Sequence, residues 1–263
     1  MTGRLVKVAK DVLAEQGHHV LESDLYGMRW KAVFDADDFP ERLDPRRLSF
    51  IHESGNAFDN GTQTPDVAAE QAKLLAADAV VLVFPLWWFS MPAILKGWVD
   101  RVFAYGLAYG YQGAGNTYRY GEGGFAGKRA LVAVTVGGSE SDYSPRGING
   151  DMDELLFPIT HGMLFFPGMD VLPPFAVYGA VQMPDEAFAT TVASWRHRLE
   201  GLFDDAPIPF RPQNAGDYPD RHVLADGVAA GTTGLRVHVA TSSPSSQRER
   251  QRLSGVAIEA DPE

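Results

Sequence analysis

Apolar positions along the chain follow a helical spacing in some segments and form unbroken runs in others. Residues 5–16 place apolar side chains on one face of a helix, and Gly17 is suited to end it. Residues 18–26 have strand character, and residues 77–84 form an almost wholly apolar, β-rich run, which is typical of a parallel strand covered on both faces. These patterns predict a chain that opens on a helix and continues into a parallel sheet.

The alternation of strands and helices continues to about residue 205. Apolar runs at residues 131–136 and 169–172 predict two further strands. Helical spacing of apolar side chains predicts helices near residues 64–76, 90–102, 152–161 and 185–203. The sequence therefore predicts an α/β fold in which a doubly wound parallel sheet carries helices on both faces.

Three segments interrupt or follow this alternation. Residues 27–64 are rich in Asp, Pro, Arg and Gly, which predicts a long excursion with at most short helices. Residues 206–240 are rich in Pro and Gly and predict a loop-rich extension beyond a catalytic domain of residues 1–205. Residues 241–263 are rich in Ser, Gln, Arg and Glu, a composition that predicts a disordered tail.

The composition narrows the classes of function. The formal net charge of −11 repels phosphate backbones and anionic lipids, so neither nucleic acid nor a membrane is an expected partner. The longest apolar run, residues 79–89, is shorter than the roughly 20 residues that cross a bilayer, and no targeting pattern precedes it, so we expect a cytoplasmic protein. The chain has no cysteine, and its histidines lack metal-ligand spacing. Redox chemistry would therefore require a bound cofactor, with no metal expected.

An aromatic loop follows the first predicted buried strand. Trp87, Trp88 and Phe89 stand where the strand ends, and ligands of doubly wound sheets collect at that edge. Three consecutive rings can line a flat slot for a conjugated ligand, although such rings also pack in helix–sheet cores. Tyr109 and Tyr111, in a glycine-rich loop further along, can cap a ligand or cover the end of the sheet.

A second candidate loop follows the next predicted strand. Gly137 and Gly138 allow backbone amides to approach a ligand closely, or they form an ordinary turn. Tyr143 and Asn149 follow them, and a phenol with an amide can hold an anionic ring edge by hydrogen bonds. Both loops are expected at the same edge of the sheet.

Residues 84–98, which read FPLWWFSMPAILKGW, resemble the signature of the NAD(P)H:quinone oxidoreductases of the DT-diaphorase family. Further matching segments lie at residues 22–26, 65–71, 107–111, 147–152 and 234–237. The resemblance covers about residues 2–240, so it extends well beyond a single motif.

This resemblance implies a flavodoxin-like fold and FAD as the cofactor, with FMN as the less favoured flavin. It implies a homodimer with shared active sites and a ping-pong reaction, in which NADH or NADPH gives a hydride to flavin N5 and a quinone then takes it. The residues that would flank the flavin ring are Leu86, Trp87, Trp88 and Phe89. The residues that would hold its polar edge are Thr135, Val136, Gly137 and Gly138.

The resemblance also assigns catalytic and substrate-binding roles. Tyr143 would be the catalytic tyrosine, because a phenol at the flavin edge can donate a hydrogen bond or a proton as negative charge develops. Asn149 would lie with it in the catalytic site. Tyr109, Tyr111 and Phe166 would line the substrate pocket, some of them from the neighbouring subunit.

Two positions mix the features of the two family types. Asn149 stands where the first type has a histidine, as it does in the second type, which favours small dihydronicotinamides. An asparagine can hydrogen-bond the flavin but carries no proton near neutral pH, which leaves the proton relay and the donor open. The segment that begins at Gly234 instead resembles the C-terminal extension of the first type.

Residues 2–26 match the first helix and second strand of the family, without the first strand and the phosphate-binding turn. We therefore expect a start codon assigned too late or a shortened chain. Loss of a central strand would leave neighbouring backbone groups unpaired, at about 1–3 kcal/mol for each buried group.

Two alternatives to quinone reduction remain. A flavin-dependent enzyme could use a nitro or azo compound as acceptor. A chain that had lost its cofactor together with the phosphate loop could serve as a binding or regulatory module.

Overall fold

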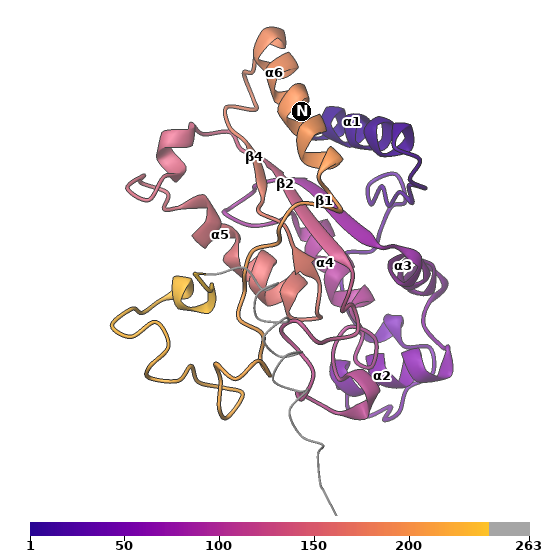
Figure 1. Cartoon of the computed structure of the whole chain (residues 1–263). Coiled ribbons are helices and arrows are strands. Elements are labelled where there is room, and N and C mark those ends of the chain that lie inside the picture. Colours follow the sequence, from indigo (N-terminus) through magenta and orange to yellow (C-terminus); the bar gives the residue numbers. More distant parts are fainter. Residues whose placement is uncertain (242–263) are drawn as a thin grey trace, which may run out of the picture.

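The computed structural model describes residues 1–241, so all but the first residue of the predicted disordered tail lies outside the described part. A parallel sheet runs through its centre (Figure 1). Strand β1 (Ala79–Pro85) pairs along its whole length with β2 (Arg129–Thr135). On the other side of β2 lie β3 (Asp170–Val171) at its start and β4 (Phe175–Val177) at its end. All these pairings are parallel, as predicted.

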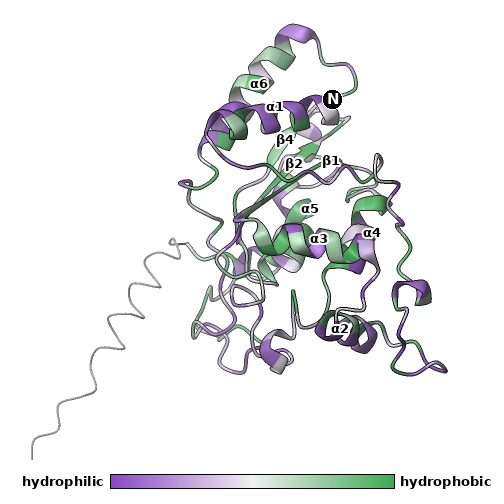
Figure 2. Cartoon of the chain, turned by 90° about the vertical axis from the view of Figure 1, so that its right-hand side faces the viewer, coloured by the Kyte–Doolittle hydropathy of each residue, from purple (hydrophilic) through white to green (hydrophobic). Residues whose placement is uncertain are grey.

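Helices cover both faces of the sheet (Figure 1). On one face, α1 (Thr2–Glu15) and α6 (Asp185–Glu200) pack against the alternate β2 residues Leu131 and Ala133. On the other face lie α3 (Pro65–Ala76), α4 (Ala93–Val102) and α5 (Met152–Ile159), followed by a π-helical turn η4 (Thr160–Phe165). The strands appear as hydrophobic segments between these helices in Figure 2. The α/β sheet with two covered faces is therefore confirmed.

The prediction of a strand at residues 18–26 was wrong. This segment forms no ladder, because β1 pairs only with β2 among the described residues and presents no strand beside the segment. Side chains hold the segment instead: Lys10 pairs with Glu22 at 2.6 Å, and Ser23 donates a hydrogen bond of 2.6 Å to Glu70. One edge of β1 is therefore without a strand partner in residues 1–241.

Residues 27–64 contain one substantial helix, α2 (Phe50–Asn60), and a short 3-10 turn, η1 (Ala36–Asp38). Helix α2 is longer than the short helices expected there. Its buried positions include Glu53, Ser54 and Gly55, so no apolar stripe marks it in the sequence. Buried Glu53 is neutralised by Arg42 at 2.9 Å, and backbone hydrogen bonds from the neighbouring loop lower the pKa of its carboxyl despite its burial.

Residues 206–240 form an irregular extension with one short 3-10 helix, η5 (Leu235–His238). A bridge between Phe210 and Val239 brings the two ends of the extension together, and the Ile208 amide donates to the Val171 carbonyl of β3 at 2.8 Å. Arg211 donates to the carbonyl of Val237 at 2.8 Å and pairs with Asp217 at 2.5 Å. No helix among the described residues has the length and apolar character needed to cross a membrane.

Candidate functional site

The carboxyl ends of three strands converge at one edge of the sheet. Thr135, the last residue of β2, lies in register with Pro85 of β1 and Val177 of β4. The hydrogen bonds continue into the following loops, where the Leu86 amide donates to the Thr135 carbonyl at 2.9 Å and the Val136 amide donates to the Val177 carbonyl at 2.8 Å. Three loops therefore start side by side, at residues 86–92, 136–151 and 178–184.

The first loop presents its aromatic rings to solvent. Trp87 is 54% exposed, Trp88 96% and Phe89 47%. Trp87 and Ser90 exchange two backbone hydrogen bonds of 2.9 and 3.0 Å across the turn. Trp88 and Phe89 take left-handed φ values of 49° and 62°, a conformation that costs bulky residues about 1–3 kcal/mol each. Core packing therefore does not account for these rings, which are held out at the strand end.

Leu86 differs from the rings that follow it. Its side chain is half-buried and packs against the main core, so it forms the base of the aromatic loop. At the other side of the edge, the buried Thr135 hydroxyl lies 2.9 Å from the hydroxyl of Thr2, at the N-terminal end of α1. The amino end of α1 thus meets the two loops, a contact that sequence reasoning did not predict.

Gly137 and Gly138 shape the second loop. A Cβ atom at Gly137 would meet only the Val181 side chain, at 3.6 Å, so the space above this backbone is open. At Gly138 a Cβ atom would lie 3.0 Å from the Tyr143 ring, so the absence of a side chain lets that ring lie against the backbone. Val136 is buried and anchors the start of the loop.

Tyr143 ends a short 3-10 turn, η3 (Glu140–Tyr143), whose entry is fixed by reciprocal hydrogen bonds between Ser139 and Asp142. Its ring lies 5.9 Å from the ring of Tyr178, which directly follows β4. Burial raises the pKa of the Tyr178 phenol most, and the carboxylates of Glu140, Asp153 and Asp151 raise it further. The phenol therefore stays protonated at neutral pH. Sequence reasoning missed Tyr178, because its place depends on the register of the short strand β4.

The loop that carries Tyr143 folds back and brings the backbone of Asn149 next to that of Asp142. The Asn149 amide donates to the Asp142 carbonyl at 2.9 Å, which closes the loop one residue before Tyr143. Gly147 is required at this closure, because a Cβ atom there would lie 2.3 Å from the same Asp142 carbonyl oxygen. Ile148 projects from the loop and is 92% exposed.

The predicted substrate residues form a separate aromatic wall. The rings of Tyr109 and Phe166 lie 6.1 Å apart, and the Tyr120 ring contacts both Phe166, at 5.1 Å, and His161 of the π-helical turn, at 4.8 Å. Burial raises the pKa of Tyr109, and Tyr105 adds to this shift. Tyr111 is 39% exposed beside the wall. Within residues 1–241, no ring contact joins this wall to Trp88 or Tyr143.

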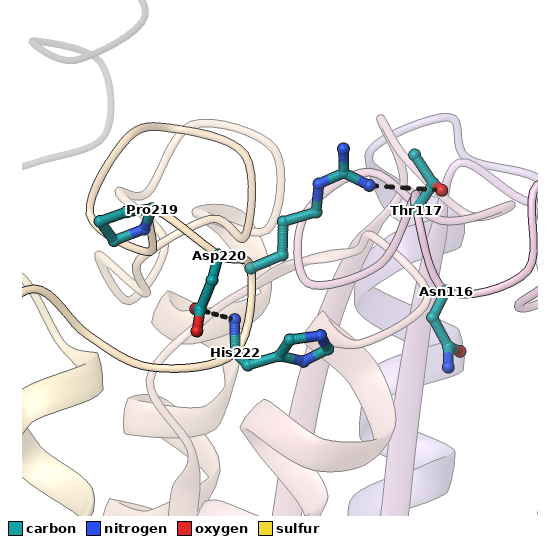
Figure 3. Close-up of a pocket in the computed structure, with 6 residues that line it drawn as sticks. Asn116, Thr117, Pro219, Asp220 and His222 are labelled. Atoms are coloured by element: carbon teal, nitrogen blue, oxygen red, sulfur yellow. Dashed lines mark hydrogen bonds between the residues drawn. The ribbon is translucent and has the colours of Figure 1, made fainter.

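A surface pocket of about 350 Å³ lies between the glycine-rich loop and the C-terminal extension (Figure 3). Its lining residues are Asn116, Thr117, Pro219, Asp220, Arg221 and His222. Arg221 donates a long hydrogen bond of 3.5 Å to Thr117, and the Asp220 carboxylate accepts from the His222 amide at 2.8 Å. No predicted site residue lines this pocket. The described residues also contain no cluster of three or more side chains able to hold a metal ion.

Comparison with known proteins assigns the family. A protein family described as having a flavodoxin-like fold matches residues 1–199. A putative quinone reductase of Klebsiella pneumoniae superimposes with a TM-score of 0.87 at 50% identity, over 91% of this chain and 94% of that one. A ribosyldihydronicotinamide dehydrogenase-like protein of Penicillium crustosum is 47% identical, over 83% of this chain and 82% of that protein. NAD(P)H dehydrogenase (quinone) 1 of Rattus norvegicus is 40% identical, over 80% of this chain and 76% of that protein.

These matches place the chain in the flavodoxin-like class of α/β proteins. Within that class, the chain belongs to the NAD(P)H:quinone oxidoreductase family.

Proposed function

We propose that this protein is a flavin-dependent oxidoreductase that reduces quinones by two electrons and uses a reduced nicotinamide as donor. The observation that carries the proposal is the exposed aromatic loop with Trp88 at its tip, held at the same sheet edge as Gly137 and Tyr143. The relatives named above as quinone reductase and NAD(P)H dehydrogenase support it.

The residues present fit a flavin ring. Trp88 offers an almost free aromatic face, and the backbone above Gly137 is open. Exposed apolar surface of this kind is typical of sites that bind a ligand or a partner protein. The side chains that would flank the ring are Leu86, Trp87, Trp88 and Phe89, and the backbone that would hold its polar edge is that of Thr135, Val136, Gly137 and Gly138. A bound flavin would supply the hydride acceptance and release that this cysteine-free chain lacks.

Tyr143 and Asn149 act at the polar edge of that site. The Tyr143 phenol donates a hydrogen bond or holds a proton where negative charge develops during reduction. Asn149 donates through its amide and transfers no proton. A flavin stacked on the rings of the aromatic loop would exclude water from this edge and so strengthen both hydrogen bonds.

We further propose FAD, rather than FMN, as the flavin, on the resemblance to the DT-diaphorase family. The donor is NADH, NADPH or a smaller dihydronicotinamide. The names of the relatives allow either kind of donor, and Asn149 follows the second family type. Rates of flavin reduction with NADH, NADPH and dihydronicotinamide riboside would rank the three.

We also propose a homodimer in which the substrate wall of one subunit faces the flavin edge of the other. Within residues 1–241 no ring contact joins Tyr109 or Phe166 to Trp88, which is compatible with a second subunit bringing them together. Exposed apolar side chains in residues 27–64 offer a contact surface, and they include Val33, Leu43, Phe50 and Ile51. Light scattering on the purified protein measures the subunit number, and a monomer at working concentration would contradict the arrangement.

The direct test is reduction and reoxidation of the purified protein. After incubation with FAD and desalting, the protein should be yellow, bleach with NADH or NADPH under anaerobic conditions, and regain colour with menadione. A panel containing a nitroaromatic and an azo dye separates quinone reduction from the alternative acceptors. A protein that retains neither FAD nor FMN would refute the proposal and support a binding module instead.

A further inference from the structure

The C-terminal extension contacts the far end of the loop that carries Tyr143 and Asn149. Arg236, in η5, places its Nε atom 2.9 Å from Glu154 and its terminal nitrogen 3.3 Å from Asp151. Both carboxylates belong to the start of α5. These ion pairs join segments that are more than 80 positions apart in the chain. One of the two carboxylates, Asp151, stands two residues after Asn149.

Asp151 has a double role at this point. Its Oδ1 atom caps α5 by accepting hydrogen bonds from the amides of Asp153 and Glu154, at 3.0 and 3.4 Å. Its Oδ2 atom remains for Arg236. Because the cap residue also ends the loop, the ion pair contacts the point at which the loop enters α5. The preceding residue, Gly150, has a φ of 83° and offers little stiffness of its own.

Helix η5 is itself anchored, so Arg236 acts from a fixed position. The carbonyl of Val237 accepts from Arg211 at 2.8 Å, and the Arg211 amide donates to the His238 carbonyl at 2.9 Å. The His238 ring lies 2.8 Å from the hydroxyl of Tyr218 and packs 5.6 Å from the ring of His161. The Arg236 side chain is 63% exposed, but it extends from a backbone that these contacts hold in place.

The charges around the loop explain why a cation is useful there. Asp151, Asp153 and Glu154 fall within four residues, and the charge of Glu140, like those of Asp151 and Asp153, acts on the nearby Tyr178 phenol. In the described part of the chain, Arg236 is the cation that forms ion pairs with this group. Negative charge that develops at a flavin edge would be disfavoured by uncompensated carboxylates nearby.

We infer that Arg236 is a positioning residue for the flavin site: through Asp151 it holds the loop that carries Tyr143 and Asn149, and it offsets the carboxylates around that loop. The inference rests on the proposed function for the role of the loop, whereas the attachment of the loop to the extension does not depend on it.

Hydrogen–deuterium exchange on the flavin-free protein tests the attachment. Arg236→Gln should speed exchange of the amides in residues 144–151 several-fold, and Arg236→Lys should have a smaller effect. Arg47→Gln is the matched control, because it removes an equal charge from an exposed position that forms no side-chain ion pair with any of residues 1–241. Equal exchange in Arg236→Gln and Arg47→Gln would overturn the inference.

Flavin binding and turnover test the positioning role. Arg236→Gln should weaken flavin binding about fivefold, which corresponds to two half-exposed ion pairs, and lower kcat with little change in the quinone KM. Asp151→Asn preserves the helix cap, because asparagine caps as well as aspartate. Arg236→Gln should therefore weaken flavin binding and lower kcat by less in the Asp151→Asn variant than in the wild type.

The outcomes separate the two proposals. Faster loop exchange with unchanged flavin affinity and kcat would refute the positioning role. If the wild-type chain bound no flavin at all, the proposed function would fail, and the exchange experiment would still decide whether Arg236 secures the loop.

Discussion

Replacement of Trp88 by glycine should have opposite effects on the fold and on the ligand site. Trp88 is 96% exposed with a left-handed φ of 49°, so the side chain adds almost no burial to the folded chain. Relief of the left-handed conformation recovers about 1–2 kcal/mol, and the extra backbone entropy of glycine costs about 0.5–1 kcal/mol. The free energy of unfolding should therefore stay constant or rise by up to about 1.5 kcal/mol.

The flavin-binding effect follows from the same ring. A stacked ligand covers about half of a tryptophan side chain, roughly 100 Å², which is worth about 2.5 kcal/mol, and stacking adds about 0.5–1 kcal/mol. Trp88→Gly should thus weaken FAD binding by about 100-fold or more. Trp88→Phe is the matched variant, because it keeps an aromatic face and should lose only part of the affinity.

Urea denaturation and flavin titration measure the two effects separately. The reasoning would be refuted if Trp88→Gly lost more than about 2 kcal/mol of stability, because the ring would then be part of the core. Unchanged FAD affinity would show that the ring does not contact the flavin.

Three further predictions concern Tyr143, proposed above as the catalytic tyrosine, and two buried groups. Tyr143→Phe should slow flavin reduction by NADH about 100-fold in stopped-flow traces. The control is Tyr26→Phe, at an exposed tyrosine, and equal reduction rates in the two variants would exclude Tyr143 from catalysis. Arg101→Met should cost about 3–5 kcal/mol in urea unfolding, since buried Asp38 loses its nearest cation, at 2.7 Å, and keeps the longer contact of 3.4 Å with Lys31. Lys96→Met on the same helix removes an exposed ion pair and should change little. Burial lowers the pKa of His161 from 6.5 to about 4, with His238 adding to the effect, so the unfolded chain binds the proton more readily. Up to about 3 kcal/mol of stability should be lost as the pH falls from about 6.5 to about 4, and His161→Phe should flatten that part of the profile; an unaltered profile would exclude His161 as the cause.

The sheet and most helices could be predicted because their apolar patterns are local. Both β1 and β2 were placed within two residues, since each is an unbroken apolar run. The segment 18–26 reads as a strand but has no strand to pair with, which is a property of its neighbours. Helix α2 was underestimated because it buries Glu53 and Ser54, whose burial depends on contacts that only folding creates.

In the candidate site, too, residues with a local pattern could be predicted and residues placed by distant contacts could not. Trp88 and Tyr143 could be placed at a strand end from the sequence, because loops after parallel strands share one edge. Tyr178 could not, since its position depends on how the three-residue strand β4 pairs with β2. Arg236 could not either, because its partner Asp151 lies 85 positions away in the chain and no local pattern links them.

The exposure of Ile148 has a practical use. This side chain stands at the crest of the turn between the two catalytic candidates and contributes nothing to the core. Because the chain is naturally free of thiols, Ile148→Cys would give a single attachment point for a fluorophore or a spin label. Such a reporter would follow cofactor arrival in real time without background labelling elsewhere.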